Sequence, residues 1–145
     1  MTEAATASSL LIERELPHPL EKVWRALTQS ALIEAWLLKN DFEPVVGHRF
    51  TLRAPPMPQW NGLVDCEVLA IEPPARLAYS WKVGEDGPGA MRTVVTLTLT
   101  PTPGGTHLRM EQSGFRTDQE NNRRGAEFGW RRFMDGLERV VAGLD

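Results

Sequence analysis

The most regular hydrophobic pattern of the chain lies at its C-terminal end, over residues 117–144. Charged side chains occupy one side of this segment, as expected for a helix with one face in water. We predict one long helix that begins near Asp118, with Thr117 and Glu120 as a capping box. At 1.5 Å per residue it would extend roughly 40 Å. The apolar side chains recur at three- and four-residue steps and so share one face: Ala126, Trp130, Phe133, Met134, Leu137, Val140, Val141 and Leu144.

Four glycines, Gly125, Gly129, Gly136 and Gly143, lie along one flank of this apolar face. Each costs about 1 kcal/mol relative to alanine inside a helix, so their presence needs a reason. Two interpretations stay open. Either another element approaches the helix backbone closely, or the missing side chains leave empty volume that forms the beginning of a cavity.

Upstream of the helix, apolar and polar residues alternate with period two, which is typical of strands. Proline- and glycine-rich turns separate the alternating runs. The predicted strands cover residues 10–16, 49–53, 62–71, 76–83, 93–100 and 106–114. The side chains expected to face inward from the later strands are Leu77, Tyr79, Trp81, Leu108, Met110 and Gln112.

Two short helices are predicted between the first strand and the others. Pro19 suits the first position of one helix, and Ser30 suits the cap of the next. The element order predicts an α+β fold in which a curved antiparallel sheet of about six or seven strands wraps around the long C-terminal helix. We expect a flexible tail at residues 1–9 and a single domain over residues 10–145.

Composition limits the possible functions. The chain has 145 residues, of which 41% are hydrophobic and 24% charged, which is ordinary for a soluble domain with a full core. The net charge of −3 argues against nucleic-acid binding, because that function needs a basic face. The single Cys66 excludes an internal disulfide. Residues 1–9 contain neither a basic residue nor an apolar run, so we expect a cytoplasmic protein with no membrane anchor.

The sequence shows no catalytic constellation. His18, His48 and His107 are far apart and have no metal-ligand spacing, so neither a metal site nor a cofactor is expected. Strict alternation puts Asp65 and Glu67 on the same face as Leu63, Leu69 and Ile71. In one interpretation this apolar face and the two acids point inward. In the other, which we favour, a bulge in the strand returns the acids to water. If the two acids were buried, Arg14 would be their counter-charge.

Tryptophans are frequent, with five in the chain. Trp36, Trp81 and Trp130 are expected to converge with Trp60, either as the wall of a ligand pocket or simply as core. Trp60 lies in the proline-rich loop 54–62 together with Met57. We predict that this loop is a gate and that Trp60 packs over the opening near Trp36. The alternative is that Trp60 lies at a homodimer contact.

Several short motifs occur together in a specific order, and by them the chain resembles the SRPBCC (START-like, Bet v 1-like) superfamily. The closest likeness is to the branch related to the activator of Hsp90 ATPase. The resemblance implies a helix-grip fold and a cavity for lipids, sterols, polyketides or other aromatic ligands. The motifs are IEREL (12–16), VWRALT (23–28), EPPARL (72–77), SW (80–81), VTLTLTP (95–101), SGF (113–115) and GW (129–130).

Ligand binding is the leading functional hypothesis, with a small hydrophobic or aromatic molecule between the sheet and the C-terminal helix. One alternative is an interaction module for an Hsp90-type chaperone ATPase. Another is a cyclase- or aromatase-like enzyme with Asp65 or Glu67 as general base. Whether the protein is an enzyme stays open, with binding favoured, and it is expected to be a monomer or a homodimer. The candidate ligand-binding residues are Arg14, Trp36, Trp60, Tyr79, Trp81, Met110, Trp130, Phe133 and Leu137.

Overall fold

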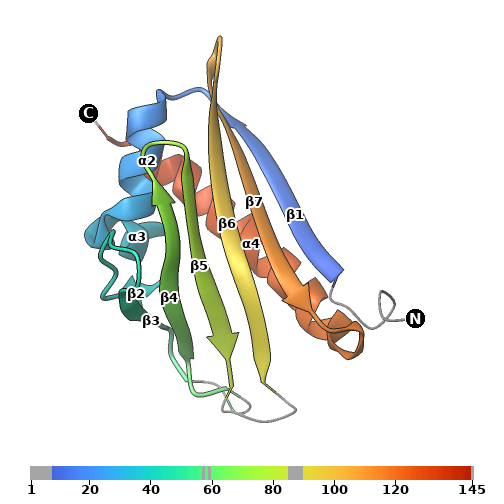
Figure 1. Ribbon diagram of the computed structural model, residues 1–145. Helices are drawn as coiled ribbons and strands as arrows, with labels where there is room; N and C mark the ends of the chain where they lie inside the picture. The colour runs from blue at the N-terminus through green and yellow to red at the C-terminus, as the bar shows by residue number, and fades with distance from the viewer. Residues whose placement is uncertain (1–7, 57, 59, 85–89, 145) are drawn as a thin grey trace.

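The structure of the protein is a computed structural model that describes residues 8–56, 58, 60–84 and 90–144 (Figure 1). The strands are β1 (Ser8–Leu16), β2 (Lys39–Asn40), β3 (Arg49–Arg53), β4 (Leu63–Glu72), β5 (Arg76–Val83), β6 (Met91–Thr102) and β7 (Gly105–Phe115). The helices are α2 (Leu20–Thr28), α3 (Ser30–Trp36) and α4 (Glu120–Ala142), and a short 3-10 turn, η1 (Thr117–Gln119), precedes α4.

The strands form one antiparallel sheet in the order β1-β7-β6-β5-β4-β3-β2. The expectation of six or seven strands is confirmed. From β3 to β7 each strand pairs with the next one along the chain, whereas β1 pairs with β7, the last strand. The sequence pattern did not predict β2, because a strand of two residues is too short to show a period.

The helices cover one face of this sheet, and α4 runs diagonally across it behind the strands (Figure 1). With 23 residues α4 is about 35 Å long. It buries Trp130, Met134, Leu137 and Val141, while Arg124 and Arg131 are exposed. The expected helix-grip arrangement is therefore confirmed.

The start of α4 differs from the prediction. A 3-10 turn comes first, and the helix begins at Glu120 rather than near Asp118. Gln119 caps the 3-10 turn rather than α4: its side-chain oxygen accepts a hydrogen bond from the backbone N–H of Arg116 at 2.9 Å. Its amide nitrogen donates to the carbonyl of Ala90 at 3.1 Å. The predicted Thr117–Glu120 capping box is wrong, and Glu120 pairs with arginines of its own helix instead.

The two short helices also begin differently in detail. Pro19 is the residue before α2 rather than its first residue. Ser30 does not cap α3, because its hydroxyl lies 2.7 Å from the side-chain oxygen of Asn40 in β2. This contact fastens the start of α3 to the edge strand.

The inward face of β4 carries Val64, Cys66 and Val68, all buried. Asp65 and Glu67 alternate with them and lie on the outer face. The interpretation that the two acids point inward is therefore wrong. Leu63 and Leu69 on the same face are exposed, and only Ile71, beyond a register shift between Val68 and Ala70, packs against the core. The counter-charge of the two acids is not Arg14 either.

Arg14 lies on the inner side of β1 and reaches α4. Its guanidinium donates to Asp135 at 2.9 Å and to Glu138 at 3.0 Å. Its side chain is about one quarter exposed (23%), so it lies at the rim between the sheet and the helix. Arg14 therefore fastens the edge strand to α4.

Candidate functional site: an aromatic interface between the sheet and α4

Trp130 of α4 is the centre of an aromatic cluster between the helix and the sheet. Its ring is 2% exposed and lies 5.4 Å from that of Trp81 in β5, measured between centroids. The ring of Trp36 in α3 lies 6.4 Å away, and that of Phe133, one turn along α4, lies 5.7 Å away. We call Trp36, Tyr79, Trp81, Trp130 and Phe133 the aromatic cluster. Two helices, α3 and α4, and one strand, β5, thus contribute rings to this cluster.

The row of rings continues along the inner face of the sheet. Tyr79 is stacked on Trp81 at 6.5 Å, and Phe50 of β3 meets Tyr79 edge-on at 5.4 Å. Phe42 extends the row, 5.2 Å from Phe50. Aromatic rings therefore form a nearly continuous layer from α4 toward the β3 edge.

A buried polar group lies against this aromatic layer. Gln112 of β7 is fully buried, and its side-chain oxygen accepts a hydrogen bond from the indole N–H of Trp130 at 2.9 Å. Its amide donates to the hydroxyl of Thr93 at 2.9 Å, and that hydroxyl donates to the carbonyl of Trp81 at 3.1 Å. The sequence pattern predicted that Gln112 faces inward, but Gln112 was not among the candidate ligand-binding residues. The feature that could have identified it is a glutamine among the otherwise apolar inward positions of this strand.

Two ionisable side chains are buried near this layer, and burial keeps both neutral. Burial raises the pKa of the Tyr79 hydroxyl far above its usual value, and the nearby Cys66 raises it further. Burial also raises the pKa of the Cys66 thiol, with smaller contributions from Asp65 and Asp41. Near neutral pH this interior therefore presents hydrogen-bonding groups without charge.

The remaining candidate residues lie at the margins of the aromatic cluster or beneath it. Met110 and Leu137 are fully buried on the facing surfaces of β7 and α4. Trp60 is half-buried against the core, and its indole N–H donates to the carbonyl of Leu63 at 2.9 Å. Among the ring contacts of the described residues, none joins Trp60 to Trp36. Met57, the other large residue of the expected gate, lies outside the described residues.

The glycines of α4 lie along a flank that another element approaches at one turn but not at another. At Gly136 an added side-chain carbon would lie 3.5 Å from the carbonyl of Trp36, so α3 approaches the helix backbone there. At Gly129, two turns earlier, the same carbon would meet nothing within 4 Å. Phe133, between the two glycines, is only half-buried. Close approach is therefore confirmed at Gly136, whereas at Gly129 the space beside the backbone is open and a cavity there stays a prediction.

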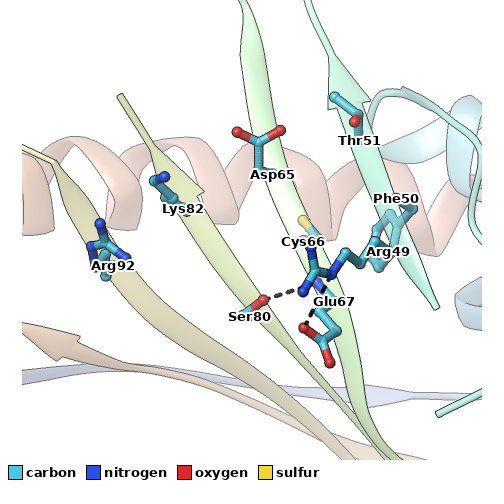
Figure 2. Close-up of a pocket in the computed structure, with 9 residues that line it drawn as sticks. All are labelled: Arg49, Phe50, Thr51, Asp65, Cys66, Glu67, Ser80, Lys82 and Arg92. Carbon is cyan, nitrogen blue, oxygen red and sulfur yellow. Dashed lines mark hydrogen bonds and ion pairs between the residues drawn. The ribbon is translucent and has the colours of Figure 1, made fainter. Parts of the chain in front are cut away.

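The outer face of the sheet carries a separate, polar groove of about 500 Å³ (Figure 2). Figure 2 shows its charged side chains in front of the strands, with α4 behind them. Within it the hydroxyl of Ser80 accepts the backbone N–H of Glu67 at 2.8 Å, and Arg49 lies 3.7 Å from the carboxylate of Glu67. Asp65 and Glu67 line this groove, not the interior. An acid–base step inside the fold cannot use them from this position.

The part of the chain that the structure describes contains no group of three or more His, Cys, Asp or Glu side chains arranged to hold a metal ion. Among those same residues, no helix is both long and apolar enough to cross a membrane.

The sequence matches the model of a known protein family. The family model of the Activator of Hsp90 ATPase homolog 1-like proteins matches residues 17–142, nearly the whole chain. The chain belongs to this family. The resemblance to that branch of the SRPBCC superfamily is thereby confirmed. Among proteins with curated functions, none matches this member of the family.

Solved structures agree with the family assignment. The crystal structure of MLL2253 from Mesorhizobium loti is 53% identical, with a TM-score of 0.88 over 95% of this chain and 99% of that one. BH1534 from Bacillus halodurans is 24% identical, with a TM-score of 0.77 over 94% and 99%. DynU16, from the dynemicin biosynthetic locus, is 22% identical, with a TM-score of 0.79 over 93% of this chain and 47% of that one. For the last two, the likeness concerns the fold alone.

Proposed function

We propose that the protein binds a small hydrophobic or aromatic molecule between the sheet and α4. The observation that carries this proposal is the aromatic cluster around Trp130, with half-buried Phe133 at its margin and open space beside Gly129. Aromatic walls with a few fixed polar groups are how small-molecule sites are generally built. In this proposal the ligand enters beside Gly129 and stacks on the cluster.

The buried polar group supports the same proposal. Gln112 and Thr93 lie beside the Trp130 ring and are held by hydrogen bonds. A fixed amide and hydroxyl can orient a polar substituent on an otherwise apolar ligand. The neighbour DynU16 comes from the dynemicin biosynthetic locus, so the fold also occurs in a biosynthetic setting.

The other candidate residues take peripheral roles in this proposal. Met110 and Leu137 form the apolar floor, and Arg14 closes the rim through its contacts with α4. Trp60 covers a second opening, between the sheet and the two short helices near Trp36, with a homodimer contact as the alternative. Sedimentation of the Trp60→Ala variant distinguishes these two roles, because only the second predicts a change from dimer to monomer.

Ligand binding takes precedence over the two other functions considered from the sequence. Contact with a chaperone ATPase has the family's description as its support, with no particular surface of this chain. A cyclase-like reaction inside the fold cannot use Asp65 or Glu67 as its general base, since both residues lie on the outer face.

A neutral aromatic probe tests the proposal. N-phenyl-1-naphthylamine should become fluorescent on binding, and excitation of the tryptophans should transfer energy to it because the cluster surrounds the site. Gly129→Leu should weaken probe binding about tenfold, since it fills the open space at the entry, which corresponds to about 1.4 kcal/mol. The same variant should not lower stability, because no atom lies where the new side chain begins.

Gly125→Leu is the matched control, one turn earlier on α4 and also without neighbours, but exposed. It should leave probe affinity within about twofold, as surface changes usually do. Native mass spectrometry of mildly purified protein should reveal a co-purifying apolar molecule that Gly129→Leu loses. Equal probe binding by both variants and the parent protein would refute an entry beside Gly129.

A further inference from the structure

A second hollow, of about 490 Å³, lies at the β2–β3 edge of the sheet, where α3 leads into β2. Part of its lining is apolar. Leu37 and Leu38 follow α3, and Ala54 and Pro55 follow β3. Leu37 is only 7% exposed and directly follows Trp36 of the aromatic cluster. The apolar side of the hollow is therefore anchored in the core and is firmly placed.

Two cations face each other across this hollow. Lys39 of β2 and Arg53 of β3 are direct partners in the antiparallel register, so their side chains project from the same face. Both are exposed, and both line the hollow. Like charges directly opposite each other destabilise a strand pair. The position of these two residues therefore needs an explanation other than sheet stability.

Neither cation is paired with a carboxylate of the described residues. Throughout the described ranges, no hydrogen bond or ion pair joins the side chain of Lys39 or Arg53 to another residue. Arg49, at the other end of β3, differs in this respect because it lies 3.7 Å from Glu67. The lining of the hollow includes a single acid, Glu34, so two positive charges there face one negative charge.

We propose that this hollow binds an amphipathic anion, with its acidic group held by Lys39 and Arg53 and its apolar part laid over Leu37, Leu38 and Ala54. A guanidinium offers paired donors that match a carboxylate or a phosphate, and an ammonium adds a second point charge. Bound anion would also relieve the repulsion between the two cations. This site lies outside the aromatic cluster, and its test does not depend on a ligand there.

Titration with ten-carbon amphiphiles tests the site. Decanoate and decyl phosphate should shift the backbone amide resonances of residues 38, 39, 53 and 54 in NMR spectra, and their relative affinities show which acidic group is preferred. Decanol and decyltrimethylammonium, which have the same chain without the negative charge, should bind at least about tenfold more weakly, as should acetate, which has no chain. The Lys39→Gln/Arg53→Gln double variant should lose decanoate and decyl phosphate binding by a similar factor.

Arg49→Gln is the matched control for Arg53→Gln, since it removes the same charge from the same exposed face of β3. It should leave amphiphile affinity within about twofold. Arg53→Gln should also unfold at an equal or higher urea concentration than the parent protein, because it removes a repulsion.

Three results would overturn the proposal. Decanol could bind as tightly as decanoate, which would make the charges irrelevant. Arg49→Gln could weaken binding as much as Arg53→Gln, which would indicate a general charge effect. The shifts could instead centre on the indole N–H of Trp130, which would place the amphiphile in the aromatic cluster. The last result would count against this hollow while supporting the proposed function, so the two proposals can fail separately.

Discussion

Gln112 links β7 to the Trp130 ring in the middle of an apolar interior, and its two hydrogen bonds fix the orientation of that ring. A buried amide of this kind is stabilising only while every partner stays in place. If the ring of Trp130 forms a ligand-binding wall, Gln112 is the residue that holds the wall still.

Gln112→Met should lower the free energy of unfolding by about 1–3 kcal/mol, measured by urea denaturation. The replacement keeps the volume but leaves the indole N–H of Trp130 buried without an acceptor. In a Trp130→Phe background the same change should cost clearly less, because the orphaned donor is gone. Equal costs in the two backgrounds would mean that the hydrogen bond is not what Gln112 contributes.

His107 lies on the outer face between two carboxylates of the neighbouring strand. Its Nε2 lies 2.8 Å from Glu13, and its Nδ1 contacts Glu15. The hydrogen bond to Glu15, and to a smaller extent the one to Glu13, raises the pKa of His107 above its usual value. The protonated ring therefore joins β7 to β1, the strand at the sheet edge.

The pH dependence of stability should show this link. The pKa of His107 is raised in the folded state. The stability that the protonated ring contributes is therefore fully present below the unfolded pKa of about 6.5, and it is lost as pH rises through the folded pKa. The difference in urea midpoint between the parent protein and His107→Gln should thus be largest near pH 5.5 to 6 and should shrink at alkaline pH. His18→Gln, in the turn after β1, is the control. A difference that grew with pH would contradict the assignment.

At the scale of elements, α4 is the longest helix among the described elements and runs diagonally across the inner face of the sheet (Figure 1). Its apolar stripe contacts β1 and β7 as well as α2 and α3. Most of a helix's stability in a protein comes from packing of such a stripe rather than from helix propensity. Four glycines in α4 and at its end make this dependence on packing stronger.

Leu137→Ala should cost about 2–5 kcal/mol of unfolding free energy, because the Leu137 side chain is fully buried beneath the sheet. Arg139→Ala, two residues later on the exposed side of α4, should change it by no more than about 0.5 kcal/mol. Urea denaturation of the two variants measures both values. A loss in Leu137→Ala no larger than in Arg139→Ala would mean that α4 contributes little to the fold.

For the whole molecule, local periodicity accounts for what the sequence predicted. The long helix, most strands and the inward positions of Tyr79, Trp81 and Met110 follow from repeats that are visible within ten residues. The convergence of Trp36, Trp81 and Trp130 followed from the expected layers, and their rings do meet. Their role in binding a ligand stays a prediction.

The features that the sequence did not predict depend on distant pairing. Lys39 and Arg53 face each other only through the register of a two-residue strand. Arg14 finds Asp135 and Glu138 only after β1 has been placed at the edge above α4. The turn chemistry at Gln119 was missed for a similar reason, because its second partner, Ala90, directly precedes β6, far away in the sequence.

The pairing of the first strand with the last one sets the order in which a growing chain can fold. Residues 8–16 bond to residues 106–115, so β1 emerges from the ribosome about 100 residues before its partner. At about 5–20 residues per second this delay is on the order of 5–20 s, and α4 follows later still. In the meantime β3 to β6 can pair, but of the helices only α2 and α3 have been made to cover their apolar face. The growing chain is therefore most vulnerable to aggregation before α4 emerges, and α4 is the element that ends that exposure.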